Sequence, residues 1–229
     1  MGDFNGDGYV DVLLTSYRNA GSYIQNSIIY YGSATGLDSV GTEVMATAGS
    51  LRSCIGDLND DGFDDIVQAS HYSGSSYSTT SYIYWGSANG ISQSDSTPLA
   101  TNSPYDCAVE DMNQDGFLDI YFPAYAGARE AYVYWGSNSS VYDANNRTDL
   151  AYVDYTLHAN VEDVNLDGYP DLLFGSYWSN DGAYLGSANG YSSSNFESFN
   201  QAYIYDVAAG DLNRDGLYDM VTCQYVNDA

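Results

Sequence analysis

A nine-residue acidic pattern recurs five times along the chain and limits what the chain can fold into. The copy at Asp57 reads D-L-N-D-D-G-F-D-D, which is D-x-N-x-D-G-x-x-D in general form. The other copies start at Asp3, Asp111, Asp163 and Asp211, so that successive starts are 54, 54, 52 and 48 residues apart. A near-constant period of this length predicts a repeat protein, in which each repeat packs against its neighbours.

The residue types in the pattern suit a hard metal cation. Asp, Asn and Asp at positions one, three and five place three side-chain oxygens on one side of a tight turn, and Gly at position six permits the positive φ of that turn. The seventh position varies, so only its backbone carbonyl can be a shared ligand, and Asp at position nine closes the cage. A loose cage of roughly six to eight oxygens favours Ca²⁺ over Mg²⁺.

The pattern therefore predicts up to five structural Ca²⁺ ions, each held by five residues of one loop. The predicted ligands are Asp3, Asn5, Asp7, Tyr9 and Asp11; Asp57, Asn59, Asp61, Phe63 and Asp65; Asp111, Asn113, Asp115, Phe117 and Asp119; Asp163, Asn165, Asp167, Tyr169 and Asp171; and Asp211, Asn213, Asp215, Leu217 and Asp219. The alternative is five plain acidic β-turns, but turn chemistry does not require a further Asp at position nine.

An EF-hand begins in the same way, but it needs a bidentate Glu at position twelve and a helix on either side. The twelfth positions here are Leu14, Gln68, Phe122, Phe174 and Thr222. None of these residues is a carboxylate, and the flanking runs are short and β-type. The pattern therefore excludes an EF-hand.

The charge of the chain points away from nucleic acid and from anionic membranes. Asp and Glu number 31 against 5 Lys and Arg, which gives a net charge of −26. Fifteen of the acids are the Asp residues at positions one, five and nine of the five loops, and five Ca²⁺ ions would change the net charge from −26 to −16. We expect folding to depend on the ion, because the loop carboxylates repel one another without it. Phosphate backbones and anionic lipids would be repelled.

Short β-type runs surround every loop and predict an all-β fold. One run precedes the loop, a second follows it, and a third ends in an aromatic-Gly-Ser signature such as Tyr84-Trp85-Gly86-Ser87. A weaker fourth run leads to the next copy. Four antiparallel strands in about 50 residues are typical of a β-propeller blade, with the loop between the first and second strands. The predicted units of this single complete or partial propeller domain (1–229) are 1–50, 51–104, 105–156, 157–204 and the partial 205–229.

The count of strands, about four and a half blades, leaves two interpretations open. The C-terminal first strand could complete the N-terminal blade and close a four-bladed ring with one spare strand. Alternatively, the chain is part of a longer protein with further blades, which is the interpretation we favour.

Cys54, Cys107 and Cys223 each fall in a predicted strand, and we expect buried free thiols there, although a pair between neighbouring strands stays open.

Trp85 and Trp135 are expected to pack between blades, with sugar stacking as the alternative. Trp178, in the loop Ser176–Asp181 between the second and third strands, has no equivalent in the other units and is a candidate ligand contact. His71 replaces a repeated Tyr and is expected to be a surface variant.

Arg52, Asp106, His158 and Asp206 each stand five residues before a loop. First strands line the central channel of a propeller, so these four side chains could converge there. A catalytic His–Asp arrangement would be one use of them, and simple exposure to a solvated channel is the other. No nucleophile motif, phosphate loop or zinc spacing is present.

With loop and strand signature together, the sequence resembles the FG-GAP/VCBS repeat family, which includes the β-propeller of integrin α-subunits. The loop at Asp57 and the run Tyr84–Gly90 carry the resemblance, with their equivalents in the other units. The resemblance implies one Ca²⁺ per loop and a secreted or cell-surface protein, and it does not specify a ligand.

The leading functional hypothesis is a non-enzymatic binding or adhesion module that recognises a protein or glycan through its loops. One alternative is a lectin with a sugar site in each blade. The other is an accessory domain of an extracellular polysaccharide-degrading enzyme. We expect no transmembrane helix, because no run of about 18 apolar residues occurs.

Overall fold

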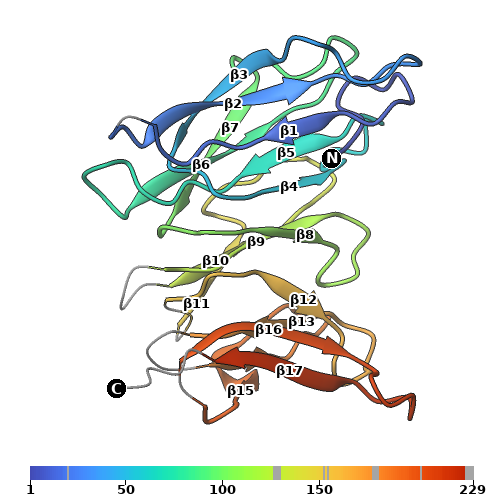
Figure 1. The fold of residues 1–229 in the computed structure, drawn as a ribbon. Helices are drawn as coiled ribbons and strands as arrows, with labels where there is room; N and C mark the ends of the chain where they lie inside the picture. Colours follow the sequence, from blue (N-terminus) through green and yellow to red (C-terminus); the bar gives the residue numbers. More distant parts are fainter. Residues whose placement is uncertain are drawn as a thin grey trace.

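The computed structural model describes residues 1–19, 21–125, 130–151, 153, 155–176, 181–201 and 203–224. These residues form five antiparallel sheets that follow one another from the N-terminal sheet to the C-terminal sheet (Figure 1). The predicted all-β propeller architecture of four-stranded blades is confirmed, with three four-stranded sheets between a three-stranded and a two-stranded one.

Within each sheet the strands are paired in chain order. The first sheet holds β1 (Val12–Leu14), β2 (Ile24–Tyr30) and β3 (Thr42–Ala48). The second holds β4 (Ser53–Gly56), β5 (Asp65–Gln68), β6 (Thr79–Tyr84) and β7 (Ser96–Thr101). The third holds β8 (Ala108–Glu110), β9 (Asp119–Phe122), β10 (Ala131–Tyr134) and β11 (Arg147–Leu150). The fourth holds β12 (Asn160–Glu162), β13 (Asp171–Phe174), β14 (Gly182–Tyr184) and β15 (Phe196–Ser198), with a short 3₁₀ turn at Ser193–Asn195, and the last holds β16 (Ile204–Gly210) and β17 (Asp219–Gln224).

The hydrophobic core lies between the sheets. One buried cluster joins Val67 and Ile83 of the second sheet to Ile120 and Phe122 of the third, and three similar clusters join the other neighbouring pairs. Every residue of β5, β9 and β13 is buried, because these second strands have a neighbouring sheet on both faces. This explains their continuous apolar runs, which differ from the alternation of a half-exposed strand.

The C-terminal first strand does not complete the N-terminal blade. β16 pairs with β17, whereas β1 pairs with β2 in a separate sheet. The two sheets also lie at opposite ends of the row in Figure 1. Among the described residues, therefore, the four-bladed ring with a spare strand is not the arrangement that forms.

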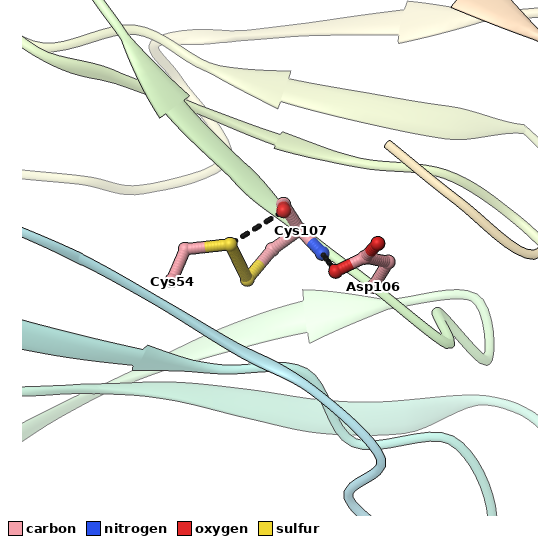
Figure 2. Close-up of side chains that lie close together, drawn as sticks. All are labelled: Cys54, Asp106 and Cys107. Atoms are coloured by element: carbon pink, nitrogen blue, oxygen red, sulfur yellow. Dashed lines mark hydrogen bonds between the residues drawn. A yellow bond between two sulfur atoms is a disulfide. The ribbon is translucent and has the colours of Figure 1, made fainter. Parts of the chain in front are cut away.

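The expectation of free thiols at Cys54 and Cys107 was wrong, since the two residues form a disulfide (Figure 2). Cys54 lies in β4 and Cys107 immediately precedes β8, so the bond links the first strand of one sheet to the residue before the first strand of the next. Cys223 is a free thiol, as expected, but it is exposed on β17 instead of buried. The disulfide between Cys54 and Cys107 is therefore the alternative, a pair between neighbouring strands, that the sequence left open.

Candidate metal loops

The second loop shows how the acidic pattern folds. Asp57 accepts hydrogen bonds from two backbone N–H groups, at Oδ1 from Asp61 (3.0 Å) and at Oδ2 from Gly62 (2.8 Å). Asn59 Oδ1 accepts from Asp61 N (3.0 Å), and Asp61 Oδ1 accepts from Phe63 N (3.0 Å). The side-chain oxygens at positions one, three and five thus accept hydrogen bonds from the backbone of the turn that they belong to.

The same four hydrogen bonds recur in the other four loops. The first-position acceptors there are Asp3, Asp111, Asp163 and Asp211, the third-position acceptors are Asn5, Asn113, Asn165 and Asn213, and the fifth-position acceptors are Asp7, Asp115, Asp167 and Asp215. Five independent copies therefore adopt one local structure.

The positive φ predicted for the sixth-position Gly is confirmed in all five loops. The φ values are 86° for Gly8, 89° for Gly62, 92° for Gly116, 97° for Gly168 and 89° for Gly216.

The fourth position is also left-handed, with φ between 59° and 68°, which the sequence did not reveal. Its residues are Gly6, Asp60, Gln114, Leu166 and Arg214. These side chains share no property that would signal such a conformation.

The ninth-position Asp binds two separate parts of its repeat. Asp65 is fully buried; its Oδ2 accepts from Leu58 N (2.8 Å) and its Oδ1 from Gly86 N (2.7 Å), which follows the third strand. Asp11, Asp119 and Asp171 are equally buried and make the equivalent pair of bonds. Asp219 accepts from Leu212 and Asn213 within its own loop.

Burial raises the pKa of the Asp65 carboxyl to about 7, against the opposing effect of its two N–H donors. The carboxyl of Asp119 has the same environment, and burial raises its pKa to about 7 as well. A nearby cation would favour the ionised form of both groups.

The donor set of each loop fits a hard cation, because it consists of carboxylate, amide and carbonyl oxygens. That the 25 predicted ligands bind an ion stays a prediction. Among the described residues, the one group of three His, Cys, Asp or Glu side chains whose ligand atoms all lie within 4.8 Å of one another is Cys54, Asp106 and Cys107 (Figure 2). Both of its sulfurs are committed to the disulfide, so this group is not a metal site.

The four residues that stand five positions before a loop converge, as predicted. Asp106 Oδ2 lies 3.6 Å from Arg52 Nη1 and 3.6 Å from His158 Nδ1, and His158 Nε2 lies 4.0 Å from Asp206 Oδ2. Burial raises the pKa of Asp106, while the Cys107 N–H and the Arg52 guanidinium oppose that effect. These contacts link four consecutive repeats, at residues that lie in the first strand of a sheet or just before it.

The expectation that His71 is a surface variant was wrong. His71 is only 3% exposed; its ring stacks on Tyr105 at 3.9 Å, and its Nδ1 lies 2.7 Å from Ser103 Oγ. Burial lowers the pKa of His71, with a smaller opposing effect from the Ser103 carbonyl. Ser103 is itself fully buried, so this Ser–His pair is closed to a substrate.

His71 belongs to a group of packed rings that we call the tyrosine cluster. Its members are Tyr17, Tyr23, His71, Tyr72, Tyr77, Tyr105 and Tyr125, whose neighbouring centroids lie 3.9–6.4 Å apart. They come from the segments between second and third strands and from the segment before β8. These segments lie at the opposite end of the strands from the acidic loops.

The expectation that Trp85 and Trp135 pack between blades is confirmed. Trp85 lies 6.4 Å from Tyr142 of the next repeat, and Trp135 stacks on Tyr191 at 5.9 Å. Each indole N–H donates to a threonine of its own fourth strand. Trp178 lies outside the described residues, so its role as a ligand contact stays a prediction.

The fold and the loops together define an all-β repeat protein with an oxygen-rich loop between the first two strands of each blade. The sequence profile of the FG-GAP-like repeat matches residues 3–68, 57–122 and 163–222. Because these matches cover most of its length, the chain belongs to the FG-GAP-like repeat family.

Several curated relatives are integrin alpha chains. Identity is 31% over 98 residues with integrin alpha-IIb of Mus musculus, 28% over 152 with integrin alpha-PS3 of Drosophila melanogaster and 30% over 156 with integrin alpha-3 of Cricetulus griseus. These matches cover 40%, 58% and 59% of this chain but only 10%, 13% and 15% of the relatives. The chain therefore corresponds to a small part of each relative.

A solved structure shares the fold at a TM-score of 0.55 and 12% identity, over 96% of this chain and 59% of the other. Its title describes recognition of non-reducing terminal N-acetylglucosamine by an Agrocybe aegerita lectin. Among the described residues, no helix has the length and apolar character needed to span a membrane.

Proposed function

We propose that this chain is a calcium-stabilised, non-enzymatic binding or adhesion module of a secreted or cell-surface protein. The single observation that carries the proposal is the identical hydrogen-bonded structure of five loops that present the same oxygen ligands. The similarity to integrin alpha chains supports the adhesive role and the extracellular location.

Calcium has a structural role in this proposal. The ion would be held by the loop between the first two strands of a blade, so it would join these strands through their connection. It would also supply positive charge to a chain of net charge −26. The carboxylates now accept backbone N–H bonds, and an oxygen with two lone pairs can accept such a bond and face a cation together.

The tyrosine cluster supports a binding surface at the end of the blades opposite the acidic loops. Tyr77 is 43% exposed there, and Ser73, Ser75, Ser76 and Ser78 surround it in sequence. Tyrosine and serine together supply rigid ring area and adaptable hydrogen bonds, as in other protein-binding loops. We propose that a protein or glycan ligand contacts this end, and the acidic charge disfavours an anionic one.

Thermal unfolding tests the calcium role. We expect a large rise in Tm on adding Ca²⁺ to EDTA-dialysed protein, and a much smaller rise with equimolar Mg²⁺, because the loose oxygen cage suits the larger ion. Circular dichroism is the measurement. A cooperative transition with the same Tm in EDTA and in Ca²⁺ would contradict the proposal.

A Tyr77→Ala variant separates ligand binding from calcium binding. Its calcium-dependent Tm shift should equal that of the wild type, because Tyr77 is distant from every loop along the blade. Binding to a ligand found by screening in Ca²⁺ should be lost. If the variant retains full binding, the ligand uses another surface.

A further inference from the structure

The acidic loop of repeat 1 is held by the neighbouring repeat. The backbone N–H of Asp3, the first residue of this loop, donates to Asp64 Oδ2 at 2.8 Å. In return, the Asp64 N–H donates to the Asp3 carbonyl oxygen at 3.1 Å. Asp64 is the eighth residue of the loop of repeat 2, so the two loops are joined directly at the first predicted ligand of loop 1.

Two further contacts belong to the same junction. Ser87 N, after the third strand of repeat 2, donates to the Phe4 carbonyl at 3.3 Å. The ring of Phe63 lies against Gly6, where an added Cβ would come within 2.6 Å of the ring. Repeat 2 thus contacts the first, second and fourth residues of loop 1.

A carboxylate at position eight occurs in repeat 2 alone. The equivalent residues are Val10, Leu118, Pro170 and Tyr218. Leu118 packs against Gly56, where an added Cβ would lie 3.0 Å from Leu118 Cδ1, and Asp64 packs against the equivalent Gly2 at 2.7 Å. The same place in the fold therefore accepts either an apolar side chain or a carboxylate.

Within its own repeat, loop 1 is closed by the bridge between Gly2 and Asp11, and Asp64 contacts the loop beside that bridge. We propose that Asp64 is a positioning residue for metal binding by loop 1, which it reaches from the neighbouring repeat. This inference rests on the proposed calcium role.

The physical reason is the orientation of Asp3. The Asp3 side chain is a predicted ligand, and its backbone is held at the N–H by the Asp64 carboxylate and at the carbonyl oxygen by the Asp64 N–H. Holding the ligand residue before the ion arrives removes part of the ordering cost of binding. The Asp64 carboxylate also adds one negative charge near the loop, so the test must separate charge from positioning.

Calcium titration of ¹⁵N-labelled protein tests the proposal, with the sixth-position Gly amides as reporters. Gly8, Gly62, Gly116, Gly168 and Gly216 each donate to the first Asp of their own loop, so each amide reports on one site. The key variant is Asp64→Leu, which copies the residue of repeat 3. Asp64→Asn removes the same charge but keeps an oxygen acceptor, and Asp60→Asn removes an exposed charge four residues away.

We expect the apparent Kd reported by Gly8 to be about fivefold weaker in Asp64→Leu than in Asp64→Asn, since the neutral hydrogen bond that Asn keeps and Leu lacks contributes about that factor. The Gly116, Gly168 and Gly216 midpoints should not change, and Asp60→Asn should match the wild type at Gly8 apart from a small charge effect.

Equal Gly8 midpoints in the Leu and Asn variants would overturn the role of Asp64 while leaving the calcium proposal intact. No calcium-dependent shift of any of the five amides in the wild type would overturn both. If the Leu variant lost its amide dispersion, the Asp64→Ser variant, whose shorter side chain withdraws the acceptor, would replace it in the same comparison.

Discussion

At the scale of single residues, the ninth Asp of each loop has a role that its position in the pattern does not disclose. The sequence predicts a ligand that closes the cage. The structure shows a buried carboxylate that also fastens the loop to the Gly after the third strand, as between Asp65 and Gly86. The Gly-Ser pair after the third strand recurs in the sequence and could have indicated this contact, but the Asp that accepts the Gly86 N–H lies 21 residues away. Sequence spacing does not show which side chain reaches it.

Metal-free protein should lose stability as the pH rises. Burial raises the pKa of Asp65 and Asp119 to about 7 in the folded chain, above the ordinary unfolded value of about 4. Their contribution to stability is therefore complete below about pH 4 and is lost as the pH rises through about 7. We expect a lower urea midpoint at pH 8 than at pH 5.5 in EDTA-dialysed protein.

Two comparisons check the cause of this pH dependence. The Asp65→Asn/Asp119→Asn double variant should show a shallower fall, because two of the carboxyls whose pKa is raised are removed, while Asp11, Asp106 and Asp171, whose pKa burial also raises, remain. Saturating Ca²⁺ should reverse the slope, since the ion binds the ionised carboxylates. A metal-free protein that is more stable at pH 8 than at pH 5.5 would contradict the assignment.

At the scale of strands and loops, periodicity predicted the order of elements better than their ends. The β-type run that follows the first loop, Val12–Leu14, predicts a second strand and forms β1 over the same residues. The run that precedes the third loop, Tyr105–Glu110, predicts a first strand of six residues, whereas β8 forms only over Ala108–Glu110. Asp106 Oδ1 accepts the N–H of Cys107 at 2.9 Å, which removes that group from strand pairing. A local side-chain bond of this kind shortens a strand without changing its hydrophobic pattern.

The disulfide was missed for a related reason. Cys54 and Cys107 stand three and four residues before their respective loops, so the repeat does not align them. Whether they meet depends on how β4 and β8 lie against each other across two blades. The period of a sequence gives the number of units but not this alignment.

Removing the disulfide should destabilise the calcium-loaded protein. The bond closes a chain separation of 53 residues, and loss of such a cross-link costs about 2–4 kcal/mol. Urea unfolding of the Cys54→Ser/Cys107→Ser variant should show this loss, and Cys223→Ser is the matched control because its thiol is exposed and free. Equal midpoints for the double variant and the control would show that the cross-link contributes nothing.

At the scale of the whole molecule, stability depends on the interfaces between repeats. The buried clusters each combine residues of two neighbouring sheets, and β5 is buried on both faces. A chain of this kind gains stability from nearest-neighbour contacts, and one unit alone has no core of its own. The repeat period and the all-β class were predictable, because both follow from a pattern that recurs five times.

An isolated second repeat should therefore not fold. We expect a peptide of residues 51–104 to give a collapsed amide spectrum by NMR even in saturating Ca²⁺, because both apolar faces of its sheet would be exposed. The full chain in the same buffer is the control. A dispersed spectrum from the peptide would mean that the sheet and its ion suffice without neighbours.

The location of the core between repeats also affects how such a chain can change length during evolution. Duplicating one repeat adds one sheet and one interface that resemble those already present, so the new unit needs no new set of buried partners. Losing one repeat brings together two faces that each already fit a similar neighbour. A contact such as that between Asp64 and Asp3 is different, because it occurs at one junction only. Shuffling the repeats would preserve the cores and separate this pair, so the order of units carries information that the shared pattern does not.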